Sequence, residues 1–229
     1  MIQTRTIDSY HFGFAFNLAE SQLRTLTGFF HHPEPTRVSV LGGRTSVTTV
    51  MLDGIGPAVI KHYRRGGLMR FIVKSRYLKI GKTRAQREFE MLDTVGALGL
   101  NVPQPVAYAH RGPLFYQAWL VTRAIHQPLS LARLSLQDPK KIGDAMEAVI
   151  EQISLLVQNS ILHVDLHPGN IVVDPTGKVY LLDFDKGGVY HGNRPNLKTH
   201  YLNRWQRAVR KHGLPEMLDK MMVEGLKIN

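Results

Sequence analysis

The sequence contains no cysteine, few acidic residues and no long apolar run. Without cysteine, the chain can form no disulfide, no thiolate nucleophile and no cysteine-ligated metal centre. No uncharged apolar run reaches the roughly 18 residues that a membrane-spanning helix needs. The beginning, MIQTRTIDSYHFGF, lacks the basic start and apolar stretch of a signal peptide. We therefore expect a protein that works inside a cell, in solution or at a membrane surface.

Acidic residues are outnumbered, with 18 Asp and Glu against 29 Lys and Arg and a formal net charge of +11. Ten of the basic residues lie in 61–87 and seven in 186–215, and neither stretch contains an acid. A surface of this kind attracts anions, but charge alone does not distinguish a nucleic acid, a phospholipid headgroup, a nucleotide and a sugar phosphate. A solvated surface is the other interpretation of such charge runs.

The first half of the chain is rich in short runs typical of half-buried strands. We expect strands at 36–41, 45–52, 58–63, 106–110 and 116–122. Asp53-Gly54 is typical of a hairpin turn. Apolar residues at helical spacing predict one helix over 83–98. Residues 1–35 are mixed and end in HHPEP, which is typical of a loop.

The second half begins with a helix. Asp138 is expected to cap it, with Pro139 at the first helical position. Its apolar face is formed by Ile142, Met146, Val149, Ile150, Ile153 and Val157. Two short strands, 171–173 and 179–182, follow with a Pro-Thr-Gly turn between them, and helical patterns lie around 202–209 and 215–226. A boundary between the halves is expected near 123–128.

The most specific pattern is HVDLHPGN at 163–170, followed by LLDFD at 181–185. Asp165 and Asn170 share a loop, while Asp183 ends a strand. Because two short strands joined by a tight turn form a hairpin, Asp183 should come beside the other two residues. Carboxylate and amide oxygens together suit Mg²⁺, which takes a few protein ligands and completes its shell with phosphates.

This pattern resembles the catalytic loop and metal-binding aspartate of the protein-kinase-like fold. By that resemblance, Asp165 is the catalytic base that acts on the acceptor hydroxyl. Asn170 and Asp183 are the ligands of Mg²⁺, and His163 braces the loop. The resemblance implies ATP as the phosphate donor.

The same resemblance gives roles to residues upstream. Lys61 is similar to the lysine that pairs with the ATP phosphates, and its partner should be a glutamate on the following helix. Glu88 and Glu90 both qualify, and the apolar positions that follow favour Glu88. Gly42-Gly43 lies where the glycine-rich phosphate loop should be, although the full GxGxxG pattern is missing.

The fold implied by the resemblance is α+β with two lobes. The N-terminal ATP-binding lobe, 1–124, should be a small antiparallel sheet with one helix. The C-terminal lobe, 125–229, should be mostly helical with a short catalytic hairpin.

Within this superfamily, HYRRGGL at 62–68, REFEML and GLNVPQP resemble the lipopolysaccharide kinases, above all those that act on 3-deoxy-D-manno-octulosonic acid (Kdo). The resemblance implies transfer of phosphate from ATP to the 4-hydroxyl of Kdo on a lipid A precursor. It implies work at the cytoplasmic face of the bacterial inner membrane. The location of the two acid-free basic stretches favours peripheral binding to that anionic surface over a nucleic acid partner. Arg64, Arg65 and His167 are candidate acceptor contacts.

Two departures from the protein-kinase pattern bear on the substrate. Asp185 stands where kinases usually have glycine, and His167 replaces a lysine near the transferred phosphate, which disfavours a protein acceptor. Three alternatives remain open: a small atypical protein kinase, another small-molecule kinase, and a kinase-like binding module without activity.

Overall fold

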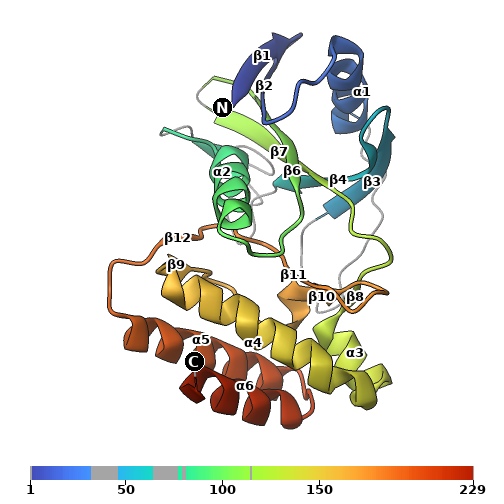
Figure 1. Ribbon diagram of the computed structural model, residues 1–229. Helices are drawn as coiled ribbons and strands as arrows, with labels where there is room; N and C mark the ends of the chain where they lie inside the picture. Colours follow the sequence, from blue (N-terminus) through green and yellow to red (C-terminus); the bar gives the residue numbers. More distant parts are fainter. Residues whose placement is uncertain (1, 32–45, 64–76, 79–80, 114, 229) are drawn as a thin grey trace. The chain divides into compact units, whose positions relative to one another are not determined.

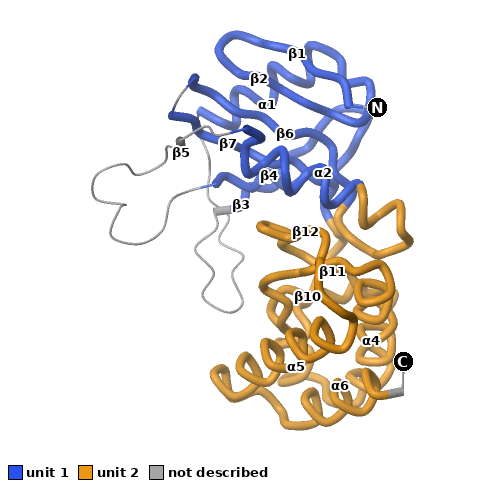
Figure 2. The backbone as a smooth tube through the Cα atoms, turned by 90° about the vertical axis from the view of Figure 1, so that its left-hand side faces the viewer, with its two compact units in different colours: residues 1–93, 104–124 blue, residues 94–103, 125–229 orange. Residues whose placement is uncertain are grey.

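The computed structural model describes residues 2–31, 46–63, 77–78, 81–113 and 115–228. The strand expected at 36–41, Gly42-Gly43, Arg64 and Arg65 lie outside the described residues. The chain divides into two compact units, which Figure 2 shows in different colours. Unit 1 comprises Met1–Asp93 and Gln104–Ala124, and unit 2 comprises Thr94–Pro103 and Ile125–Asn229.

Unit 1 is built on an antiparallel sheet with the strand order β1-β2-β6-β7-β4-β3 (Figure 1). The strands are β1 (Gln3–Ile7), β2 (Tyr10–Phe14), β3 (Ser46–Leu52), β4 (Gly56–Tyr63), β6 (Pro105–Arg111) and β7 (Phe115–Arg123), while β5 (Tyr77–Leu78) pairs with β7. The predicted hairpin turn between β3 and β4 is confirmed, since Ile55 N donates to Leu52 O over 3.1 Å. Gly54 in that turn has φ +71°, a conformation that glycine adopts at little cost.

Two helices cover opposite faces of this sheet. α1 (Glu20–His31) packs in an apolar cluster with Ala107 and Ala109 of β6. α2 (Arg84–Ala97) contacts Tyr108, the residue between them, through Phe89, with 5.2 Å between the ring centroids. Because successive side chains of a strand point to opposite faces, the two helices lie on different sides of β6.

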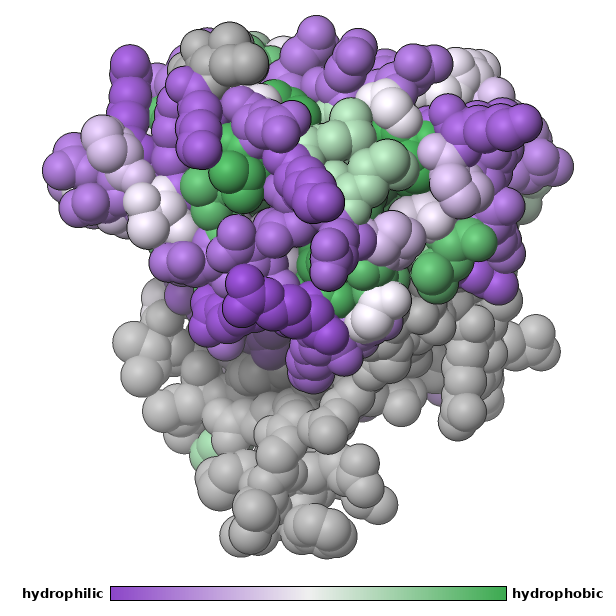
Figure 3. All heavy atoms as spheres, turned by 90° about the horizontal axis from the view of Figure 1, so that it is seen from below, coloured by the Kyte–Doolittle hydropathy of each residue, from purple (hydrophilic) through white to green (hydrophobic). Residues whose placement is uncertain are grey.

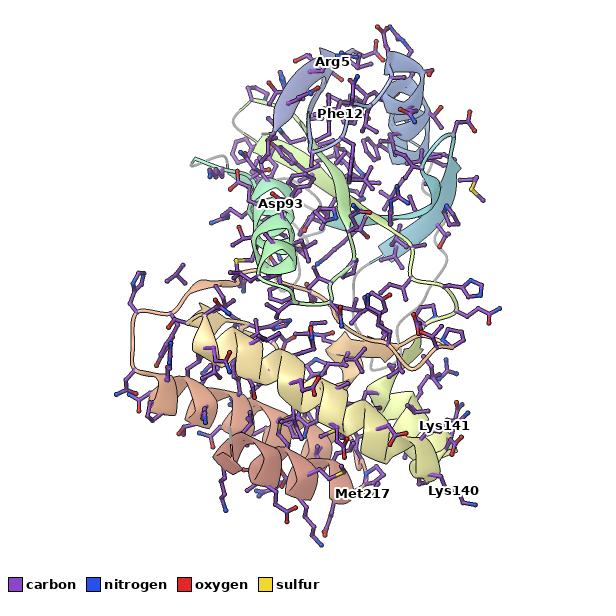
Figure 4. All side chains as sticks on the ribbon, in the orientation of Figure 1. Arg5, Phe12, Asp93, Lys140, Lys141 and Met217 are labelled. Carbon is purple, nitrogen blue, oxygen red and sulfur yellow. The ribbon has the colours of Figure 1, made fainter. Side chains whose placement is uncertain are left out.

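The expectation of one helix beside the sheet is wrong, and the sequence assigned no element to the mixed segment 1–35. β1, β2 and α1 occupy most of that segment. The ring centroid of Phe12 on β2, which is labelled in Figure 4, lies 6.0 Å from that of Phe30 on α1. The Phe30 ring stacks on the Trp119 ring with 4.7 Å between the centroids. The sequence pattern is weak because β1 buries only its last residue, and because the aromatic partners of α1 lie far along the chain.

Unit 2 is mostly helical. Its helices are α3 (Leu131–Gln137), α4 (Ile142–Gln158), α5 (Arg194–Lys211) and α6 (Met217–Ile228), with 3-10 turns η2 (Pro139–Lys141) and η3 (Pro168–Asn170). Its short strands are β8 (Leu129–Ser130), β9 (Ile161–Leu162), β10 (Ile171–Val173), β11 (Val179–Leu181) and β12 (Gly188–Val189). The six residues predicted for the apolar face of α4 are all buried. α5 is longer than the helical pattern around 202–209, whereas α6 has the length of the pattern around 215–226 and begins two residues later.

The cap predicted at Asp138 is a partial error. Asp138 precedes η2, not α4 directly, and its side chain makes no capping hydrogen bond. Its Oδ2 lies instead 3.4 Å from Lys141 Nζ, in an exposed ion pair. Lys140 and Lys141, labelled in Figure 4, mark this end of α4. Pro139, which has no backbone N–H, does lie in the first turn after Asp138, as the sequence pattern predicted.

The helices of unit 2 pack closely around buried aromatic residues. Tyr201 and Trp205 of α5 are each 1% exposed, as expected for core residues. A Cβ added to Gly225 of α6 would lie 2.5 Å from Ile150 Cδ1 of α4, so a glycine permits this close approach. Seen from the side of α5 and α6, the coloured part of the surface is mainly hydrophilic, with smaller apolar areas among the polar ones (Figure 3).

The described chain is thus a mixed α/β protein with one large antiparallel sheet and six α-helices. None of these helices is long and apolar enough to cross a membrane.

Candidate active site

Lys61 and Glu88 form an ion pair inside unit 1. Lys61 lies on β4, opposite Leu120 of β7, and Glu88 lies on the second turn of α2. Lys61 Nζ donates to both carboxylate oxygens of Glu88, over 2.9 and 2.8 Å. The side chains are 17% and 3% exposed. The pair therefore joins the sheet to the helix at a position shielded from water.

Neighbouring groups complete this pair. The Tyr63 hydroxyl donates to Glu88 Oε2, and its ring lies 5.1 Å from Lys61 Nζ. Burying a charge is costly unless hydrogen bonds replace the lost water, and the hydroxyl provides one. Glu90, the other candidate, pairs with Lys82 over 2.7 Å near the surface. The two glutamates thus have different partners, and the buried one holds Lys61.

In unit 2, the loop between β9 and β10 is folded by its own polar groups. Asn170 Nδ2 donates to the backbone oxygen of Asp165 over 2.9 Å, and Asn170 N donates to His167 O over 2.8 Å. The amide oxygen of Asn170 is not used in these contacts. This turn sets Asp165 and Asn170 at fixed positions on one loop.

The predicted β10–β11 hairpin is confirmed, with Ile171 opposite Leu181. Leu182 N then donates to Asn170 O over 2.8 Å, which places Asp183 next to this junction. Asp183 has φ +64°, a left-handed conformation that costs an aspartate about 1 kcal/mol. Such conformations concentrate at functional sites, where surrounding contacts hold them. The backbone at Asp183 is therefore held in an unusual conformation at the end of the hairpin.

His163 is fully buried and lies beside the segment where Leu182 bonds to Asn170. Its Nε2 donates to Leu182 O over 2.8 Å, and its ring contacts the Phe184 ring at 4.5 Å. Since a carbonyl only accepts, the proton is assigned to Nε2. Burial lowers the pKa of His163, although the nearby carboxylates oppose this shift. A neutral imidazole thus links the loop to the residue before Asp183.

Arg204, which no sequence motif marks, contacts the carboxylate of Asp165. Arg204 Nε donates to Asp165 Oδ1 over 2.8 Å, and Nη2 donates to the same oxygen. Arg204 lies on α5, 39 residues beyond Asp165. Only its place in the acid-free stretch 186–215 marked it, and six other basic residues share that property.

His167 lies on the other side of the same carboxylate. Its Nδ1 accepts from Gly169 N over 3.0 Å, so Nε2 carries the proton, 3.7 Å from Asp165 Oδ2. Burial lowers the pKa of His167 to about 4; the Arg204 charge acts in the same direction, and Asp165 opposes it. His167 is therefore neutral near pH 7 and adds no charge beside Asp165.

The oxygen atoms of Asn170 and Asp183 suit Mg²⁺, which needs few protein ligands, better than they suit a metal that is coordinated by protein side chains alone. No group of three or more His, Asp and Glu residues that could hold a metal ion occurs in the described parts of the chain. Asn170 and Asp183 could supply an amide and a carboxylate oxygen, and Mg²⁺ commonly takes one or two carboxylates together with substrate phosphates.

A buried lysine–glutamate pair and an Asp, Asn, Asp set on a loop and hairpin are components of sites that transfer phosphate. Residues 38–220 match the lipopolysaccharide kinase (Kdo/WaaP) family, and the chain belongs to this family of phosphotransferases. β1, β2 and α1 precede the matched segment.

Several similar proteins carry the name 3-deoxy-D-manno-octulosonic acid kinase. The protein of Vibrio vulnificus (strain CMCP6) is 33% identical over 172 residues, 74% of this chain and 71% of the relative. That of Vibrio parahaemolyticus is 35% identical over 147 residues, 63% and 61%. That of Photobacterium profundum is 36% identical over 155 residues, 66% and 64%. The chain thus spans about three fifths to seven tenths of the length of these relatives.

Proposed function

We propose that this protein is an ATP-dependent kinase that phosphorylates the 4-hydroxyl of Kdo on a Kdo-lipid A precursor, in a protein-kinase-like two-lobe fold. The observation that carries the proposal is the loop and hairpin on which Asp165, Asn170 and Asp183 lie, in a member of this kinase family. The names of the relatives support Kdo as the acceptor.

Each unit contains residues for which a role toward the donor is proposed. Lys61, held by Glu88, is suited to pair with the α- and β-phosphates of ATP, because the ion pair fixes the ammonium on the sheet. Gly42-Gly43 is proposed to contact the phosphates. Asn170 and Asp183 would hold Mg²⁺, which neutralises charge on the phosphates when bound.

Asp165 would act on the acceptor. Its carboxylate takes the proton of the sugar hydroxyl as that oxygen bonds to the γ-phosphorus, and the bond from this phosphorus to the bridging oxygen breaks to release ADP. The remaining catalysis is positioning and electrostatic stabilisation. His167 is neutral at 3.7 Å from this carboxylate, which suits a contact with an uncharged sugar hydroxyl.

Basic residues would attract the anionic acceptor and bind the anionic membrane surface. On α5, exposed cations without any acid in the helix support this proposal: Arg194, Arg207, Arg210 and Lys211. Each cation near an anionic leaflet contributes about 1 kcal/mol. Several together would hold the protein reversibly at the cytoplasmic face of the inner membrane. Arg64 and Arg65 are proposed as further acceptor contacts.

The experiment is mass spectrometry of Kdo-lipid A after incubation with the protein, ATP and Mg²⁺. We expect the gain of one phosphate, and NMR of the product should place it on the 4-oxygen. Asp165→Asn should lower the rate by about 100-fold or more. The same incubation is repeated with labelled ATP and an added protein. If the mass of Kdo-lipid A is unchanged and the label appears only on the added protein, the result would favour the atypical protein kinase instead.

A further inference from the structure

The carboxylate of Asp165 has two oxygens in different environments. Oδ1 accepts both hydrogen bonds from the Arg204 guanidinium, one of them at 2.8 Å. Oδ2 has His167 Nε2 at 3.7 Å, beyond hydrogen-bond range. No hydrogen bond to Oδ2 is found within the part of the chain that the structure describes. The lone pairs of Oδ2 thus remain available to accept the proton of an acceptor hydroxyl.

α5, the helix that carries Arg204, is anchored in the core of unit 2. Along the sequence, Arg204 lies between Tyr201 and Trp205, which are each 1% exposed. The Tyr201 hydroxyl donates to Ile161 O over 2.5 Å and accepts from His163 N over 3.0 Å. α5 therefore contacts the segment of Asp165 at two points, once through its backbone and once through its carboxylate.

An arginine is suited to this task. The guanidinium stays charged at every relevant pH and is planar, so Nε and Nη2 can approach one oxygen together only from a restricted direction. Its side chain is 25% exposed, and that of Asp165 is 49% exposed. The ion pair is therefore partly shielded, while the carboxylate remains open to an acceptor.

We propose that Arg204 is the positioning residue of the catalytic base: it binds Oδ1 of Asp165 and so leaves Oδ2 as the oxygen that receives the acceptor proton. This inference rests on the proposed role of Asp165 as base. Arg204 does not contact the reacting atoms; it acts by keeping the carboxylate in one rotamer. A misplacement of about 1 Å at such a group can cost about 100-fold in rate.

Variants at Arg204 test the proposal in steady-state assays of phosphate transfer. Arg204→Ala should lower kcat by about 10- to 100-fold, while KM for ATP changes by less than about twofold. Arg204→Lys, which offers a single point contact to Oδ1, should recover part of the loss. Methylguanidinium added to Arg204→Ala should raise kcat again, since it can occupy the space of the missing group. Arg133→Ala on the exposed side of α3 is the matched control.

Thermal unfolding separates positioning from folding. If Arg204→Ala melts well below Arg133→Ala, the kinetic comparison passes to Arg204→Lys and to the rescue by methylguanidinium, which a folding defect would not show. An unchanged or raised kcat in Arg204→Ala overturns the proposal and identifies the contact as dispensable or inhibitory. A loss expressed only in KM for the acceptor also overturns it, because that pattern indicates substrate binding.

The proposal and the proposed function can fail separately. If the wild-type protein transfers no phosphate to Kdo-lipid A, the assignment of the acceptor fails. ATP hydrolysis by the same variants then still tests Arg204, because water takes the place of the acceptor hydroxyl beside Asp165. Equal hydrolysis by wild type and Arg204→Ala, with Asp165→Asn impaired, would contradict positioning by Arg204.

Discussion

Lys61 Nζ lies 2.9 and 2.8 Å from the two carboxylate oxygens of Glu88, and the glutamate is almost fully buried. The two residues are 27 positions apart, on a strand and on a helix. A charge placed this deeply is stabilised by its partner, and removal of one partner leaves the other uncompensated. The contact therefore contributes both to the stability of unit 1 and to the placement of the ammonium for which phosphate binding is proposed.

Glu88→Gln should destabilise the protein by about 3 kcal/mol, because Lys61 and the Tyr63 hydroxyl lose a charged acceptor. Urea unfolding measures the change. Glu90→Gln is the matched control on the same helix: its partner Lys82 is 58% exposed, and a surface pair contributes less than about 1 kcal/mol. Equal losses in the two variants would contradict the distinction between a buried and a surface glutamate.

The lowered pKa of His167 predicts a loss of stability in acid. The unfolded histidine binds a proton below about 6.5, whereas the folded one does so only near 4. The unfolded state is therefore favoured as pH falls through this interval, by about 2 kcal/mol at pH 5. His167→Asn keeps an acceptor for Gly169 N and removes this titration.

Urea unfolding at pH 7 and pH 5 should thus show a smaller decrease for His167→Asn than for the wild type. The contribution of buried His163, whose lowered pKa has the same sign, remains in both proteins and cancels in the comparison. A decrease of equal size in both proteins would show that His167 titrates normally.

Tyr201→Phe should remove the hydrogen bonds that link α5 to the segment 161–163. The hydroxyl bridges Ile161 O and His163 N, and both become unsatisfied in a buried position when it is removed. The expected cost is about 1–3 kcal/mol in unfolding free energy. Amide hydrogen exchange at His163 should accelerate at the same time. Tyr190→Phe, at a half-buried tyrosine of unit 2, is the control; equal exchange at His163 in both variants would refute the bridge.

Gly225→Ala should destabilise unit 2 by about 1–3 kcal/mol through overpacking. The new Cβ would meet Ile150 Cδ1 at 2.5 Å, Cγ2 at 2.8 Å and Cγ1 at 3.0 Å, and a β-branched side chain cannot rotate away easily. Gly143→Ala on α4 meets nothing within 4 Å and should be neutral or stabilise by up to about 1 kcal/mol. The melting temperature should therefore fall for Gly225→Ala and stay or rise for Gly143→Ala, and a stabilised Gly225→Ala would contradict the close α4–α6 approach.

The sequence predicted those elements whose signals are local. The apolar spacing of α2 and α4, the turn at Asp53-Gly54 and the β10–β11 hairpin all depend on residues near one another in the chain, and the structure confirms them. The N-terminal elements were missed for the opposite reason. The burial of Phe12 and Phe30 depends on Trp119, roughly a hundred residues away.

The candidate site divides in the same way. The spacing of residue types grouped Asp165, Asn170 and Asp183, the resemblance to kinases added Lys61, and the apolar positions after Glu88 favoured it over Glu90 as the partner of Lys61. The structure confirms the pair of Lys61 and Glu88, and only the tertiary structure decided how deeply this pair is buried and that Arg204 of α5 binds the Asp165 carboxylate. The physical reason is that motifs record chemistry along a short segment, whereas ion pairs between distant residues arise from how helices pack, and no local pattern distinguishes Arg204 from its basic neighbours.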